Sequence, residues 1–206
     1  MKKHRRTLAI RSAGRKPCGW PASHPELILL TDALRLPDPL PAMRRLPPGS
    51  AVILRHYEWS YARRLALGHA MNALCRQRGL LLLVAGDARL ARAVGADGVH
   101  LPQGLLPQAA GLRRRFRMMT AAAHDAGAVA RAARAGIDAV LVSPVFATAS
   151  HPGVTGLGVL RFAALARQAQ CGGLGVYALG GMDAASMRRL RGLPMTGIAG
   201  IGGLAA

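Results

Sequence analysis

Short apolar runs recur along the chain from residue 26, separated by longer stretches rich in Ala, Arg and Leu. Runs that are apolar at nearly every position are typical of parallel strands covered on both faces, whereas a half-exposed strand alternates. Eight runs therefore predict strands: Leu27–Leu30, Ala51–Leu54, Leu80–Val84, Gly98–Leu101, Met118–Ala122, Ala139–Val142, Val176–Leu179 and Gly197–Ala199.

The stretches between these runs predict helices: Leu40–Leu46, Ser60–Arg78, Ala88–Val94, Gln108–Phe116, Ala126–Ala135, Val159–Gln170 and Ala184–Leu190. Regular alternation of strands and helices is typical of parallel βαβ units. Eight strands without a long insertion favour a closed (β/α)8 TIM barrel in a single α/β domain over an open sheet. Residues 1–25 are rich in Lys and Arg and contain no Asp or Glu. We therefore expect a basic N-terminal tail at 1–25, followed by a barrel domain at 26–206.

Glycine turns follow the last two predicted strands. Gly180 and Gly181 follow the seventh strand, and the eighth runs into Gly200, Ile201 and Gly202. Glycine lets the main chain approach an anion closely, and successive N–H groups can then hold a phosphate. In TIM barrels a phosphate site is frequent after strands 7 and 8. These five residues are the predicted phosphate site, and the ligand is expected to be a small phosphorylated molecule.

The acidic residues divide by position. Asp97 and Asp138 stand just before predicted strands, at the barrel face where residues serve stability, so we interpret them as turn residues. Asp125 and Asp183 stand just before predicted helices and are interpreted as N-caps. Asp87 follows the third strand and fits either a cap or a place in the active site.

The charge of +19 favours anionic partners. Nucleic acid is the obvious candidate, but aromatic residues make up only 4% of the chain and no zinc-finger, basic-zipper or RNP pattern occurs. We therefore expect Arg residues spread over helix faces and no nucleic-acid partner. The three cysteines lie far apart without metal or redox spacing, which favours reduced thiols in a cytoplasmic protein, and no apolar run is long enough to span a membrane.

Five segments occur in a recognisable order. They are Leu29–Asp32, Asp97–Pro102, Ala122–His124, Ser143–Thr148 and Ala178–Met182, each at or after a predicted strand. In this order and spacing the chain resembles the thiamine-phosphate synthase/TenI family over residues 26–204. The resemblance implies a TIM barrel, a place in thiamine biosynthesis, a small phosphorylated heterocycle as ligand, and pairing into a homodimer as in many barrels of this family.

The synthases of that family join a pyrimidine pyrophosphate to a thiazole phosphate with the help of Mg²⁺. Their Gln-x-Arg-x-Lys motif after the second strand keeps only Arg55 here, and their Asn-Asp-Asp motif after the third keeps only Asp87. Leu105 stands where a further metal carboxylate is normal. Because Mg²⁺ needs oxygen ligands, we expect no metal and no cofactor, with Mg²⁺ required only if the chain is a synthase.

The TenI branch also lacks these ligands, and its tautomerases use a histidine after the fifth strand to move a proton on a thiazole carboxylate phosphate. His124 matches that position, and an imidazole can accept and donate a proton near neutral pH. His124 is thus the expected catalytic residue, although a structural role in the helix start is the alternative. The expected substrate-binding residues are Arg55, Asp87, Thr148, Ser150, His151 and Gly156.

Three functions stay open. The first is a TenI-like enzyme that acts on a thiazole phosphate. The second is a divergent thiamine-phosphate synthase that uses Arg55 and Asp87. The third is a non-catalytic module that binds a phosphorylated thiamine precursor or, through its charge, nucleic acid.

Overall fold

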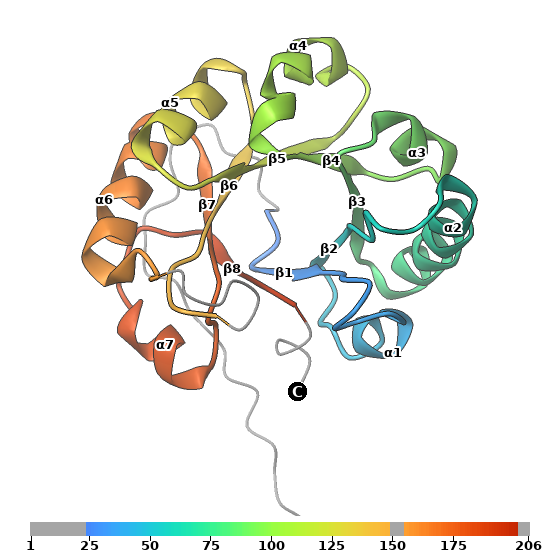
Figure 1. Ribbon diagram of the computed structural model, residues 1–206, viewed down its shortest axis with the longest axis horizontal. Coiled ribbons are helices and arrows are strands. Elements are labelled where there is room, and N and C mark those ends of the chain that lie inside the picture. Colours follow the sequence, from blue (N-terminus) through green and yellow to red (C-terminus); the bar gives the residue numbers. More distant parts are fainter. Residues whose placement is uncertain (1–23, 149–154, 202–206) are drawn as a thin grey trace, which may run out of the picture.

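The computed structural model describes residues 24–148 and 155–201, which form a closed barrel of parallel strands. The strands follow one another around the barrel in chain order, and β8 pairs with β1 to close it (Figure 1). Their bounds are β1 Leu27–Leu30, β2 Ala51–Leu54, β3 Leu81–Ala85, β4 Gly98–Leu101, β5 Met118–Ala123, β6 Ala139–Val142, β7 Gly175–Leu179 and β8 Gly197–Gly200. The TIM-barrel prediction is confirmed, and every predicted strand is found to within one residue at each end.

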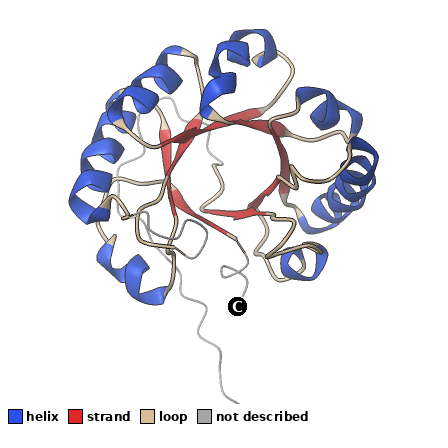
Figure 2. Ribbon diagram, viewed as in Figure 1, coloured by secondary structure: helices blue, strands red, loops and turns tan. Residues whose placement is uncertain are grey.

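The helices form a ring outside the strands (Figure 2). They are α1 Leu40–Met43, α2 Tyr61–Arg78, α3 Ala88–Ala93, α4 Ala109–Leu112, α5 Ala126–Arg134, α6 Gly158–Cys171 and α7 Ala184–Arg189, with the 3₁₀ helix η1 at Gln103–Gln108. All seven predicted helices occur, but two are shorter than expected. After Met43 and after Leu112 the backbone turns through i→i+3 bonds, from Arg45 to the Ala42 carbonyl and from Arg115 to the Leu112 carbonyl.

Two apolar layers hold the barrel. Side chains of alternate strand residues point inward and fill its centre, as in Ile28, Leu83, Met118, Leu141 and Tyr177. The residues between them point outward against the helices and form the larger core. The barrel is therefore a packed core, and an active site must lie at one of its open ends.

Acidic side chains fix the ends of helices and strands. Asp125 and Asp183 cap α5 and α7 by accepting the N–H groups of Ala128 and Ser186, each at 2.7 Å. At the opposite end of the barrel, an oxygen of Asp97 accepts the N–H of Leu82 at 2.9 Å. These contacts confirm the interpretation of three acids as structural residues.

Asp138 has the same role between β5 and β6. One carboxylate oxygen accepts the N–H of Met119 at 2.7 Å and pairs with Arg113 at 2.7 Å. This contact confirms that Asp138 is a structural turn residue.

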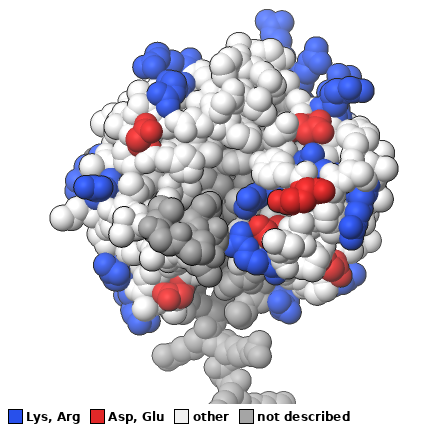
Figure 3. Space-filling model, in the orientation of Figure 1, with Lys and Arg blue, Asp and Glu red and all other residues white. Residues whose placement is uncertain are grey.

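Figure 3 shows how the charges lie on one face of the molecule. Lys and Arg atoms are spread around the ring of helices, with acidic atoms among them, and they do not gather into one continuous patch on this face. In the part of the chain that the structure describes, no helix has both the length and the apolar character that crossing a membrane requires.

Candidate active site

The ends of β7 and β8 lie side by side. Leu179 pairs with Ala199 in the parallel register, which brings Gly180 next to Gly200 and Ile201. Gly180 and Gly181 have φ values of 96° and 65°, in the left-handed region that favours glycine. The structure thus brings together four of the five residues of the predicted phosphate site. The fifth, Gly202, lies outside the described residues.

The loop after β6 packs against the glycine turn. The N–H groups of Val145 and Phe146 donate to the carbonyls of Leu179 and Gly180 at 2.9 and 3.1 Å. A Cβ atom added to Gly181 would lie only 2.7 Å from the Ala147 oxygen, so the two loops meet backbone to backbone. This contact fixes the position of the glycine turn at the mouth of the barrel.

The remaining residues predicted after β6 are only partly described. Gly156 lies against the same loop, because an added Cβ would be 2.5 Å from the Val145 oxygen. Thr148 is half-buried at the end of the described segment. Ser150 and His151 lie outside the described residues, so their roles stay predictions.

His124 follows β5 and is held by the end of β6. Its Nδ1 lies 2.7 Å from the carbonyl oxygen of Ser143. Because a carbonyl only accepts, Nδ1 carries the hydrogen, and the neutral ring then has an unprotonated Nε2 that can act as a base. The side chain is exposed. When neutral, His124 thus has Nε2 as its unprotonated nitrogen, one strand away from the loop that supports Gly180 and Gly181.

The ends of β2 and β3 form another corner of the mouth. Arg55 is half-buried and forms no salt bridge within residues 24–148 and 155–201. Asp87 caps α3 by accepting the N–H of Leu90 at 2.8 Å, and its other oxygen lies 3.7 Å from Arg64. Both oxygens of Asp87 therefore have protein partners, whereas the Arg55 guanidinium forms no salt bridge within the described residues.

One known protein family matches the chain across all of these positions. The model of a family described as thiamine monophosphate synthase matches residues 42–204, which include the β2–β3 corner, His124 and the glycine turns. The chain belongs to this family. The resemblance found in the sequence is confirmed.

Named relatives agree with this family. A thiamine-phosphate synthase of Thermus thermophilus is 38% identical over 145 residues, which are 68% of each chain. A putative thiamine-phosphate synthase 2 of Aquifex aeolicus is 32% identical over 117 residues, 56% of this chain and 61% of the relative. The solved structure of a thiamine phosphate pyrophosphorylase from Pyrococcus furiosus shares the fold, with a TM-score of 0.75 and 21% identity over 87% of each chain.

The Mg²⁺ ion that the synthases of this family use does not fit the residues present. Within the described segments, no three His, Cys, Asp or Glu side chains lie close enough together to hold a metal ion. Asp87 is engaged by the start of α3 and by Arg64. Mg²⁺ is usually held by one or two carboxylates together with substrate phosphates, and here Asp87 already faces the Arg64 cation.

Two hydrogen-bonded histidines beneath the mouth were not among the predicted site residues. His100 points into the barrel, with Nδ1 2.9 Å from the hydroxyl of Thr120. Its burial, and secondly the charge of Arg55, lower the pKa of His100 to about 3, so the ring is neutral at physiological pH. His100 thus forms a neutral polar floor below Arg55.

His56 joins β1, β2 and the loop after β1. Thr31 accepts the N–H of Arg55 at 3.0 Å, and its oxygen lies 2.8 Å from His56 Nδ1. His56 Nε2 lies 3.3 Å from the Pro37 carbonyl and must donate to it, so Nδ1 accepts from the Thr31 hydroxyl. Burial lowers the pKa of His56, which favours this neutral form. These contacts fix the backbone that carries Arg55.

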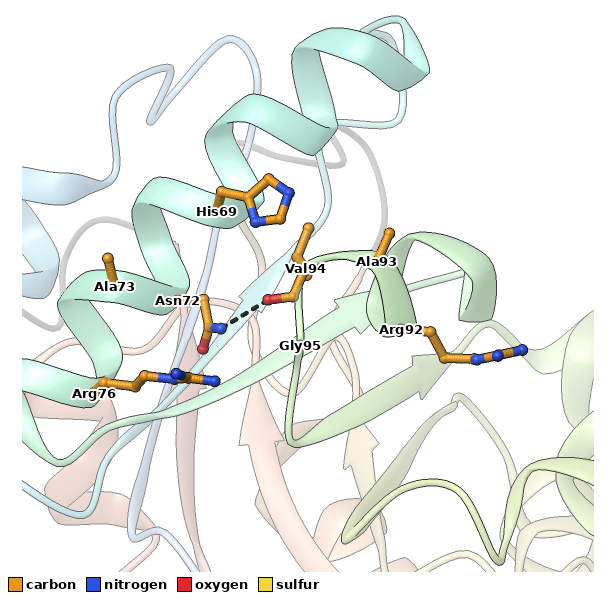
Figure 4. A pocket seen from close by; sticks show the side chains of 8 residues that line it. All are labelled: His69, Asn72, Ala73, Arg76, Arg92, Ala93, Val94 and Gly95. Atoms are coloured by element: carbon orange, nitrogen blue, oxygen red, sulfur yellow. Dashed lines mark hydrogen bonds between the residues drawn. The ribbon is translucent and has the colours of Figure 1, made fainter.

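A shallow groove of about 470 Å³ lies on the outside of the barrel between α2 and α3 (Figure 4). His69 and Arg76 reach it from α2, and Asn72 donates to the Val94 carbonyl at 2.7 Å beside it. The groove adjoins the C-terminal end of α3, at the face opposite the strand ends that carry Arg55 and His124. It is therefore separate from the candidate active site.

Proposed function

We propose that this member of the family is a TenI-like, metal-independent enzyme of thiamine biosynthesis that binds a thiazole phosphate and moves a proton on it. The observation that carries the proposal is the contact between His124 and the Ser143 carbonyl, which leaves Nε2 as the base. The glycine turns stand at the same end of the barrel, two and three strands further along. A base and an anion cradle are the two groups that such a reaction needs.

The proposed reaction divides the work between these groups. The N–H groups around Gly180, Gly181 and Ile201 hold the phosphate and so position the ring. His124 Nε2 takes a proton from one position of the bound thiazole carboxylate phosphate and returns it to another. The Ser143 carbonyl accepts from Nδ1 before and after the transfer, so it stabilises the imidazolium and keeps the ring oriented. The proton is conserved, and the step requires no metal.

The experiment replaces His124 by Ala and by Gln and follows tautomerisation by NMR, together with exchange of the substrate proton in D₂O. Loss of general acid–base catalysis should lower kcat by roughly 100-fold or more in both variants. His69→Ala is the matched control, because His69 lies in the outer groove and should retain full activity. Tautomerisation at the wild-type rate in His124→Ala would remove His124 from the mechanism.

A second candidate is a divergent thiamine-phosphate synthase. Two observations favour it: relatives are named as synthases, and Arg55 is a cation that forms no salt bridge within the described residues. Purified protein mixed with pyrimidine pyrophosphate, thiazole phosphate and Mg²⁺ tests this directly. Formation of thiamine phosphate above a protein-free control would establish the synthase, and its absence under conditions where tautomerisation proceeds would leave the first proposal alone.

A further inference from the structure

The end of β3 is covered by side chains from the segment that joins β2 to α2. The guanidinium carbons of Arg55 and Arg64 lie 5.7 and 5.9 Å from the centre of the Tyr57 ring. A Cβ atom added to Gly86 would lie 3.2 Å from Cε1 of Tyr57 and 3.9 Å from its hydroxyl oxygen. The Tyr57 ring therefore occupies the space into which a side chain at position 86 would extend.

Arg64 occupies an electrostatically unfavourable place. It stands in the first turn of α2, where the helix dipole disfavours a cation, and it is only 8% exposed. One terminal nitrogen donates to the Ala85 carbonyl at 3.0 Å, and the other lies 3.7 Å from the Asp87 carboxylate. Its buried Nε has no hydrogen-bond partner in the described part of the chain. A buried cation with an unsatisfied donor suggests a role beyond packing.

We infer that Tyr57 and Arg64 take the space and the positive charge that a divalent cation would have at the ends of β2 and β3. Asp87 faces the Arg64 guanidinium, as a metal ligand would face its ion, and the φ of 70° at Gly86 disfavours a second carboxylate there. A small oxyanion, a phosphate or a carboxylate, then binds to Arg55 without metal, and the buried Arg64 contributes its charge without contacting the anion. This inference concerns the binding corner and holds whichever reaction the protein performs.

The metal part is tested by adding Mn²⁺ to the full chain and recording the EPR signal of the free ion. Wild type and Gly86→Asp should leave the signal unchanged, because Tyr57 and Arg64 still fill the corner. Gly86→Asp combined with Tyr57→Ala and Arg64→Gln should bind Mn²⁺ and lower the signal. The matched control combines Gly86→Asp with Tyr61→Ala and Arg63→Gln, which are the same substitutions at neighbouring positions outside the corner. Tyr57 and Tyr61 are 46% and 48% exposed, so the two Tyr→Ala changes remove similarly exposed side chains.

Three results would overturn the metal part. The first is Mn²⁺ binding by wild type that Asp87→Asn abolishes, and the second is binding by the control combination. The third is that the first combination does not bind Mn²⁺ although circular dichroism shows that it is folded. The corner would then be unable to hold a metal ion even without the Tyr57 and Arg64 side chains. None of these measurements depends on His124. They can therefore overturn the metal part of this inference without bearing on the proposed reaction.

The anion part uses single substitutions that retain the bulk of the side chain. Inorganic phosphate and acetate, titrated by calorimetry in EDTA, distinguish the two oxyanion classes, and a Gly181→Ala background weakens the contribution of the glycine turns. Arg64→Gln should weaken binding of the oxyanion by about tenfold, because it removes the positive charge that balances the Asp87 carboxylate at this corner. Arg63→Gln should change nothing, because Arg63 stacks on Trp59 at 3.5 Å. Equal affinity in wild type and Arg64→Gln, or no binding of either oxyanion, would overturn this part.

Discussion

Replacing Gly181 by Ala perturbs the glycine turn at the end of β7 in a way that the structure lets us quantify. The new Cβ would lie 2.7 Å from the Ala147 oxygen, whereas real contacts of this kind start at 3.0 Å, so the loop after β6 or the turn must shift by at least about 0.3 Å. The φ of 65° adds about 1 kcal/mol of backbone strain in any residue with a Cβ. Both effects act on the N–H groups that are proposed to hold phosphate.

Gly192→Ala is the matched control for this strain. Its φ is 76°, and an added Cβ meets no atom within 4 Å. Gly192→Ala should therefore lose about 1 kcal/mol of unfolding free energy in urea denaturation and Gly181→Ala at least as much, but only Gly181→Ala should also lose ligand affinity. Loss of one amide contact to a phosphate corresponds to roughly 1.5–3 kcal/mol, or about 10-fold to 100-fold in Kd measured by calorimetry with thiazole phosphate. Equal Kd values for the two variants would refute the phosphate role of this turn.

Two further predictions concern titratable groups. The Arg35 side chain holds the pKa of Asp32 at about 2, below its ordinary value of 3.8, so the stability that Asp32 contributes is complete above about pH 4 and is lost as the pH falls toward 2. The difference in Tm between wild type and Asp32→Asn should shrink over that range, and a constant difference would contradict the pairing. Burial raises the pKa of Cys75 to about 12, whereas Cys171 is exposed. Iodoacetamide at pH 8 followed by peptide mapping should label Cys171 and spare Cys75 until the protein unfolds, and equal labelling of the folded protein would contradict the burial.

The fold could be predicted closely because one signal dominates it. Strands buried on both faces read as continuous apolar runs, so Ala51–Leu54 and Ala139–Val142 were located to the residue. The helix at α4 was overestimated because apolar composition alone does not show that the helix ends at Leu112, after which Arg115 donates to the Leu112 carbonyl in an i→i+3 turn. Capping roles could also be predicted from the sequence, because a carboxylate directly before a helix usually accepts the first N–H groups of that helix, as Asp125 does.

Less of the candidate active site than of the fold could be predicted from the sequence. His124 was found through its place after a strand and the family resemblance, but its carbonyl partner comes from the next strand end. Arg64 reads as one more charge of an Arg-rich helix, and only the folded chain shows it buried against the end of β3. The pairing of Thr31 with His56 likewise joins residues 25 positions apart. Such contacts depend on the barrel register, which no local pattern encodes.

The central claim is that backbone N–H groups at the ends of β7 and β8 hold the phosphate of the ligand. The most direct measurement is a crystal structure of the protein with thiazole phosphate bound. We predict the phosphate within hydrogen-bonding distance of the N–H groups of Gly181 and Ile201, with the ring directed toward His124. A phosphate held at Arg55 with those N–H groups unoccupied would contradict the claim.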